Sequence, residues 1–136
     1  PYAAASVHLI VAQRLARRLC PECRQPYSPG EAALREQGVG EDILPAGTRL
    51  YRPGDRGACR HCADGYRGRV GVFQVMPISP ALRQLILDGA PIAAIETQAH
   101  GENIATLRAS GLRKLRDGVT SLEEINRVTA AGTGPG

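Results

Sequence analysis

The sequence predicts a mostly α-helical fold with a short β element and a metal-binding subdomain. Several segments repeat Leu, Ile and Val at the spacing of one helix face, whereas residues 69–76 alternate with the period of a strand. All four cysteines fall into two Cys-x-x-Cys pairs. With one Phe and no Trp among 136 residues, the chain is expected to build one modest core from aliphatic side chains.

The first part of the chain is predicted to be a helix over residues 4–19. Five aliphatic side chains share one face at helical spacing, and a proline follows the last of them. They are Val7, Ile10, Val11, Leu15 and Leu19. A second, short helix is expected from Ser28, with Glu31 completing a capping box and Gly38 ending the helix. Residues 39–58 are rich in Gly and Pro, so they are predicted to be irregular.

Residues 69–76, RVGVFQVM, are predicted to form the strand. Val70 and Val72 alternate with Gly71 and Phe73 along it, so apolar side chains occur on both faces. A strand that is apolar on both faces suits a buried position better than a surface hairpin.

The rest of the chain is predicted to be helical. Serine or threonine caps, prolines at the first helical position and glycines after the last turn mark the boundaries. Thr120 and Glu123 have the spacing of a capping box for the last helix. The predicted helices begin at Ser79, Pro91, residue 102 and Thr120, and residues 130–136 are predicted to be a flexible tail.

The cysteines predict a structural zinc site formed by Cys20, Cys23, Cys59 and Cys62. A Cys-x-x-Cys turn places two thiolates on one side of a tetrahedral ion, and a second turn completes the site. The two pairs are separated by a long insert, whose closure entropy grows only logarithmically with its length. Nearby arginines would offset the negative charge of four thiolates around one zinc ion. They are Arg18, Arg24, Arg60 and Arg67.

Other interpretations of the cysteines stay open at this point. Two disulfides would need an oxidising compartment, and a catalytic zinc would need an open coordination position. A thiol redox protein would carry an accessible cysteine of low pKa. The net charge of +4, the pI near 9.2 and the RGR stretch would also fit a zinc module that binds nucleic acid. Few aromatic side chains are available to stack on bases, so no nucleic acid is expected.

The sequence contains no constellation expected to catalyse a reaction. It has no GxxxxGK[ST] phosphate-binding loop, no HExxH and no GxGxxG motif. No catalytic residue is therefore predicted, and the chain alone is not expected to hydrolyse ATP. Because it opens with Pro1, it is expected to be a fragment or a processed piece.

Three stretches resemble one known family, the bacterial type II secretion and type IV pilus assembly ATPases. They are AQRLARRLCPEC (residues 12–23), GACRHCADGYRGRVGVFQVMPIS (57–79) and LRASGLRKLRDGVTSLEEINRVT (107–129). The match is closest to the pilus-extension members, with the secretion members next. Gln74 is a departure, because many members carry Glu at the matching position.

The resemblance implies a division of the chain within a larger RecA-like α/β ATPase. The helical C-terminal subdomain would follow an inserted zinc subdomain that carries the four cysteines as ligands. The implied ranges are residues 1–19 for the end of the ATPase core, 20–68 for the tetracysteine insert, 69–78 for a returning core strand, 79–129 for the helical subdomain and 130–136 for the tail.

The resemblance also implies a function for the whole protein. It would be a hexamer in the bacterial cytoplasm, peripherally associated with the inner membrane, where ATP hydrolysis moves a platform protein for pilin polymerisation or protein secretion. ATP and Mg²⁺ would be bound mainly by upstream residues. Arg14, Arg67 and Arg69 are candidates for contacts with a neighbouring subunit or with nucleotide, or are ordinary surface arginines.

The same division predicts exposed apolar surface on the isolated chain. Residues 1–19 and 69–76 would pack against a sheet that this chain does not contain. Their apolar faces would then meet solvent, which favours instability or self-association.

Overall fold

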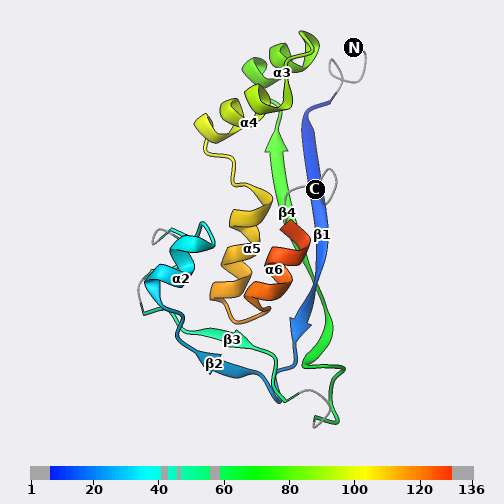
Figure 1. Ribbon diagram of the computed structural model, residues 1–136. Coiled ribbons are helices and arrows are strands. Elements are labelled where there is room, and N and C mark those ends of the chain that lie inside the picture. The colour runs from blue at the N-terminus through cyan, green and yellow to red at the C-terminus, as the bar shows by residue number, and fades with distance from the viewer. Residues whose placement is uncertain (1–6, 41–42, 46, 56–58, 130–136) are drawn as a thin grey trace.

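A long antiparallel ribbon of two strands organises the molecule (Figure 1). The computed structural model describes residues 7–40, 43–45, 47–55 and 59–129. Strand β1 (Leu9–Leu19) pairs with strand β4 (Tyr66–Pro77), although more than forty residues of chain lie between them. Helices α5 and α6 pack along the ribbon, α3 and α4 lie at one of its ends, and the insert lies at the other.

The predicted helix over residues 4–19 is wrong over its described part, which is strand β1. Residues 4–6 lie outside the described residues. The aliphatic pattern fits both structures, because β1 carries apolar side chains on both of its faces. Pairing with β4 decides between them: Val11 lies opposite Val75, and Ala16 lies opposite Val70. The chain is therefore a small mixed α/β fold and not a mostly α-helical one.

The predicted strand over residues 69–76 is confirmed and is longer than expected, since β4 starts at Tyr66. Only one of its faces is buried. Val72 is 1% exposed beneath the helices, whereas Phe73 is 44% exposed and Val75 is 49% exposed. The expectation of a strand buried on both faces is therefore wrong for this chain. The expectation of an exposed apolar face is confirmed.

Four helices follow the ribbon. They are α3 (Pro80–Leu87), α4 (Ile92–Gly101), α5 (Leu107–Arg116) and α6 (Leu122–Thr129). Ser79 caps α3 as predicted, because its hydroxyl accepts from the Leu82 N–H at 3.1 Å. Helix α5 starts later than predicted. Its cap is Thr106, whose hydroxyl accepts from the Ala109 N–H at 3.0 Å.

The capping box predicted for the last helix is wrong, and the side-chain cap lies one residue later. Ser121, not Thr120, caps α6, because the Ser121 hydroxyl accepts from the Glu124 N–H at 3.2 Å. The Thr120 hydroxyl instead donates to the Arg17 carbonyl at 2.8 Å. Thr120 therefore joins the helical hairpin to β1. The predicted tail, residues 130–136, lies outside the described residues.

The insert between the cysteine pairs is more ordered than predicted. It contains the paired strands β2 (Gln25–Tyr27) and β3 (Leu50–Arg52) and the short helix α2 (Glu31–Glu36). The Ser28 capping box is wrong, since α2 starts after Gly30 and has no side-chain cap. Gly38 follows the helix with a φ of 74°, as expected for a glycine that ends a helix.

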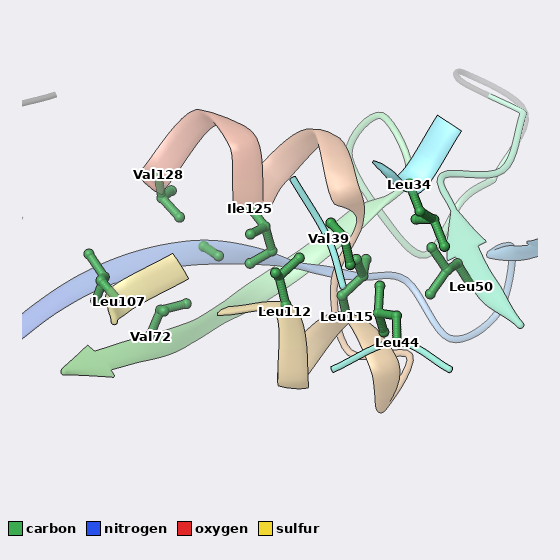
Figure 2. Packing of buried hydrophobic residues seen from close by; sticks show 11 residues of the cluster. Leu34, Val39, Leu44, Leu50, Val72, Leu107, Leu112, Leu115, Ile125 and Val128 are labelled. Carbon is green, nitrogen blue, oxygen red and sulfur yellow. The ribbon is translucent and has the colours of Figure 1, made fainter. Parts of the chain in front are cut away.

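One hydrophobic cluster joins the insert to the ribbon and the helical hairpin (Figure 2). The insert contributes Leu34, Val39, Leu44 and Leu50, and these lie beside Leu115. The residues predicted to be irregular thus supply part of the core. The insert is held against α5 and α6 by packing as well as by the chain connections at the cysteines.

Candidate metal centre

The two cysteine pairs meet at one end of the ribbon. Cys20 and Cys23 follow β1, and Cys59 and Cys62 precede β4, so pairing of the strands brings the two turns together. All four Sγ atoms lie within 4.8 Å of one another. The Sγ atoms of Cys20 and Cys59 are 4.0 Å apart, and those of Cys23 and Cys62 are 3.7 Å apart.

These separations fit a shared ion, and none of the four cysteines is paired in a disulfide. A disulfide joins its sulfur atoms at about 2.05 Å, and all four cysteines are free. Four sulfur atoms at about 2.3 Å from a tetrahedral zinc ion would be about 3.8 Å from each other. The two short separations lie on either side of that value, so the sulfur cluster has the dimensions of a four-thiolate site.

Backbone groups surround the sulfur atoms with hydrogen-bond donors. The His61 N–H donates to the Cys59 Sγ at 3.4 Å. Burial outweighs the backbone bonds of Gly54 to Cys23 and of Gly65 to Cys62, but these bonds act in the same sense, because each favours the thiolate and so opposes the rise in the pKa of its thiol. Amide donors of this kind stabilise thiolates without adding a charged side chain.

Burial opposes ionisation of the cluster. It raises the pKa of the Cys62 thiol to about 12 and also raises that of Cys23. Burial acts in the same direction on Cys20, but hydrogen bonds from the Glu22 and Cys23 backbone outweigh it and lower the pKa of Cys20. Cys23 and Cys62 therefore favour their neutral form unless a cation neutralises the thiolate charge.

Two glycines allow the chain to approach the site closely. A Cβ atom on Gly54 would lie 2.1 Å from the Cys23 carbonyl oxygen. One on Gly65 would lie 2.4 Å from the Pro53 Cβ, and Gly65 has a φ of 89°. The Gly65 carbonyl also accepts from the Cys20 N–H at 2.9 Å. Gly54 therefore lets the end of the insert approach the first cysteine turn, and Gly65 lets the chain after the second turn approach the insert and the Cys20 backbone.

The arginines expected to offset the thiolate charge are placed unevenly. Arg60 lies beside Cys59 at a shallow surface hollow. Arg24 is directed toward the helical hairpin: it donates to the Gly118 carbonyl at 2.7 Å and stacks 4.1 Å from the Tyr51 ring centre. Arg18 and Arg67 line a separate hollow beside the turn between α5 and α6.

The three candidate contact arginines do not converge on one point. Arg14 is half-buried opposite Val72, on the face that carries the helices, whereas Arg69 is exposed and pairs with Arg17. Arg67 is exposed near the start of β4, the end of the strand that follows Cys59 and Cys62.

Gln74 has a specific contact. Its side-chain amide donates to the Ala105 carbonyl at 3.3 Å and so holds the segment that leads into α5. A carboxylate at this position has no proton to donate to that carbonyl.

A buried ion-pair cluster around Glu124 was missed from the sequence. Glu124 is 0% exposed. Its carboxylate accepts from the Arg17 N–H at 2.8 Å and from the guanidinium groups of Arg17 and Arg127, each at 2.9 Å. Burial acts to raise the pKa of Glu124, but bonds from Arg127 and Arg17 outweigh it and hold that pKa at about 2. The three-residue spacing from Glu124 to Arg127 is the only local signal for this cluster.

Comparison with known proteins identifies the family. A model of the type II/IV secretion system protein family matches residues 2–127. The chain belongs to this family. The resemblance inferred from the three sequence stretches is therefore confirmed.

Several named members of this family are similar to this chain over almost its whole length. The chain is 45% identical to the type IV pilus assembly ATPase PilB of Pseudomonas aeruginosa over 127 residues, which covers 93% of this chain and 22% of that protein. It is 42% identical to PilB of Acinetobacter baylyi over 128 residues, with the same two coverages. It is 38% identical to the type II secretion system ATPase E of Vibrio cholerae over 120 residues, which covers 88% of this chain and 23% of that protein.

The chain thus spans between a fifth and a quarter of the length of these secretion-family relatives. Within the described ranges, no helix is long and apolar enough to cross a membrane.

Proposed function

We propose that this chain is the zinc-bearing C-terminal region of a pilus-assembly or type II secretion motor ATPase. It would not catalyse hydrolysis itself but would contribute to subunit contacts and transmit ATP-driven motion. The observation that carries the proposal is the cluster of four sulfur atoms within 4.8 Å of one another, in a chain of the type II/IV secretion system family.

Zinc would be held by Cys20, Cys23, Cys59 and Cys62, with all four positions filled by thiolates. Such an ion supplies structural cross-linking and no open position for substrate. The donor set supports this choice, because thiolate sulfur favours zinc over hard cations. The cross-link would fix the metal end of the β1–β4 ribbon to the insert.

The parent protein would be a hexamer on the cytoplasmic side of the bacterial inner membrane. Its upstream residues would bind ATP and Mg²⁺, and its motion would act on a platform protein. The relatives, which are named as pilus assembly and type II secretion ATPases, support this assignment. In this division, residues 1–19 and 69–78 complete a RecA-like core, residues 20–68 form the zinc subdomain, and residues 79–129 form the helical subdomain. Arg14, Arg67 and Arg69 would be contact residues.

Two other functions have weaker support. A redox cysteine needs both accessibility and a lowered pKa, but the thiol with the lowered pKa, Cys20, is buried. Binding of single-stranded nucleic acid needs free aromatic faces. Three tyrosines of the described chain instead stack with arginines of this chain. The stacked pairs are Tyr66 with Arg17, Tyr51 with Arg24 and Tyr27 with Arg52.

Metal content tests the zinc site. The chain is purified under reducing conditions without added metal, and zinc is measured by elemental analysis. One zinc per chain, with four thiols protected from alkylation, is the expected result. Paired Cys59→Ser and Cys62→Ser substitutions should abolish zinc retention. A metal-free chain with four freely reacting thiols would contradict the proposed site.

A chimera tests the motor role. This chain replaces the matching segment of the Pseudomonas aeruginosa relative, and pilus assembly is measured in cells that lack the native protein. Assembly is expected with the unaltered chain and is expected to be lost with the paired cysteine substitutions. A chimera that folds, retains zinc and hydrolyses ATP but assembles no pili would contradict the proposed role.

A further inference from the structure

A second candidate site lies next to the metal centre, where the end of β1 meets the turn between α5 and α6. The two segments are joined by a hydrogen bond from the Leu19 N–H to the Val119 carbonyl at 2.9 Å, and they lie side by side in Figure 1. A hollow opens between them, and three arginines from different parts of the chain line it. They are Arg18 from β1, Arg24 from the insert and Arg67 from β4.

From this arrangement we infer that the hollow, here called the arginine pocket, binds carboxylate side chains of an acidic protein segment. The proposal goes beyond the metal centre and does not depend on the ATPase role. Asp117 is the only acidic residue among those that line the pocket. Three arginines and one aspartate leave the pocket with a net charge of +2.

One arginine of the pocket is held in place, and two are available. Arg24 is fixed between the Tyr51 ring and the Gly118 carbonyl. Arg18 and Arg67 are exposed, and within the described part of the chain neither has an ion-pair partner. A guanidinium group presents parallel N–H donors that match a carboxylate, so two unpaired arginines beside a fixed one favour an anionic ligand.

The backbone of the pocket favours carboxylate over phosphate. Phosphate sites are typically built from free N–H groups at a helix N-terminus. Here the pocket lies at the C-terminal end of α5, where the helix dipole is negative. Five backbone N–H groups of its lining are already bonded to carbonyls: those of Leu19, Arg24, Asp117, Gly118 and Val119. The guanidinium groups are therefore the main donors, and the negative end of the helix opposes a phosphate dianion more strongly than a singly charged carboxylate.

The position of the arginines favours a protein segment over a small acid. Arg18 and Arg67 lie on the two strands of the ribbon, and Arg24 lies in the insert. The three arginines are therefore spread over three segments that border the pocket. Successive Glu or Asp side chains of one segment can therefore reach different arginines. A free dicarboxylate would engage only part of this set.

Binding of a hexaglutamate peptide to the complete chain tests the proposal, measured by fluorescence anisotropy at low ionic strength. Arg18→Gln and Arg67→Gln are each expected to weaken binding about fivefold, because each removes a charge-assisted contact. Asp117→Asn is expected to strengthen it. Arg49→Gln is the matched control, since Arg49 is exposed and is not part of the pocket. It removes the same charge and is expected to change binding less than twofold, because distant surface charges are screened.

Four results would overturn the inference. Equal weakening by Arg49→Gln would mean that only net charge matters. Equal binding of hexaglutamine would mean that carboxylates are not recognised, and tighter binding of inorganic phosphate or displacement by glutarate at similar concentration would assign the pocket to a different ligand. The zinc content and thermal unfolding of each variant are measured in parallel, so that a misfolded variant is not read as a binding defect.

Discussion

Glu124 is a buried carboxylate whose oxygens are bonded by arginines from two different elements. Arg17 lies on β1, and Arg127 lies one turn further along α6. Both guanidinium groups are partly exposed, so water screens their attraction to Glu124. The bond from the Arg17 backbone N–H is less screened, because it ends on a carboxylate that solvent does not reach.

Replacement of Glu124 by Gln is expected to lower the free energy of unfolding by about 2 kcal/mol. The neutral amide accepts at one atom only, and its NH₂ group would face arginine donors. Urea denaturation of the complete chain measures the change. Glu96→Gln, at an exposed position on α4, removes the same charge and is expected to cost less than about 0.5 kcal/mol. Equal costs at the two positions would contradict the proposed importance of the buried cluster.

The ion pairs of Glu124 should also make the free energy of unfolding depend on pH. The pKa of Glu124 is about 2 in the folded chain and about 4.5 without its partners. Since the folded pKa is the lower one, its contribution is complete above about pH 5 and is lost as the pH falls toward 2. Thiolates at a metal site also protonate in acid, so the informative quantity is the difference between wild type and Glu124→Gln. That difference should shrink between pH 5 and pH 2, and a constant difference would contradict the assignment.

Single residues differ in how far the sequence predicts them. The four cysteines are predictable because each pair is a local turn with a spacing set by metal chemistry. Glu124 is not, because its main partner, Arg17, lies 107 positions away in the sequence. Glu124 is also adjacent to Glu123, and two acids near a helix N-terminus are ordinary without any partner.

At the scale of elements, the helices after residue 79 follow local rules, and β1 does not. Proline, glycine and hydroxyl caps act within a few residues, so they predict α3 and α4 closely. Strand β1 is decided by its pairing with β4, which lies beyond the insert. Thr120 shows the same limit on a smaller scale, since its bond to the Arg17 carbonyl leaves the capping role to Ser121.

The contact between Gly54 and the first cysteine turn is expected to be intolerant of a single methyl group. Gly54→Ala would place a Cβ atom 2.1 Å from the Cys23 carbonyl oxygen, a backbone atom that cannot move without displacing the turn. We expect a loss of about 2 kcal/mol in the free energy of unfolding and faster release of zinc to a chelator. Gly30→Ala is the control in the same insert, because nothing lies within 4 Å of its Cβ position. Unchanged zinc release in Gly54→Ala would show that this contact does not hold the first cysteine turn in place.

At the scale of the whole molecule, the ribbon has one covered face and one open face. Helices α5 and α6 cover the face that carries Ala16 and Val72. The open face carries apolar side chains that are each more than 40% exposed. They are Leu9, Val11, Leu15, Phe73 and Val75. Their register places them on one side of the two strands, so they form a continuous apolar surface and not scattered exposed residues.

This open face predicts that the isolated chain associates with itself and binds an apolar dye. Val11 and Val75 lie opposite each other in the ribbon, so Val11→Lys combined with Val75→Glu replaces the centre of the surface with an opposite-charge pair. Because both side chains are already about half exposed, the double variant should unfold at nearly the same urea concentration as wild type while it sediments as a monomer and binds less dye. Leu87→Lys, at a 45% exposed position on α3 outside the ribbon, is the control and should leave association unchanged. If the wild-type chain sediments as a sharp monomer and binds no dye, the open face does not drive association. Exposed strands of this composition would then be stable in water without a covering layer.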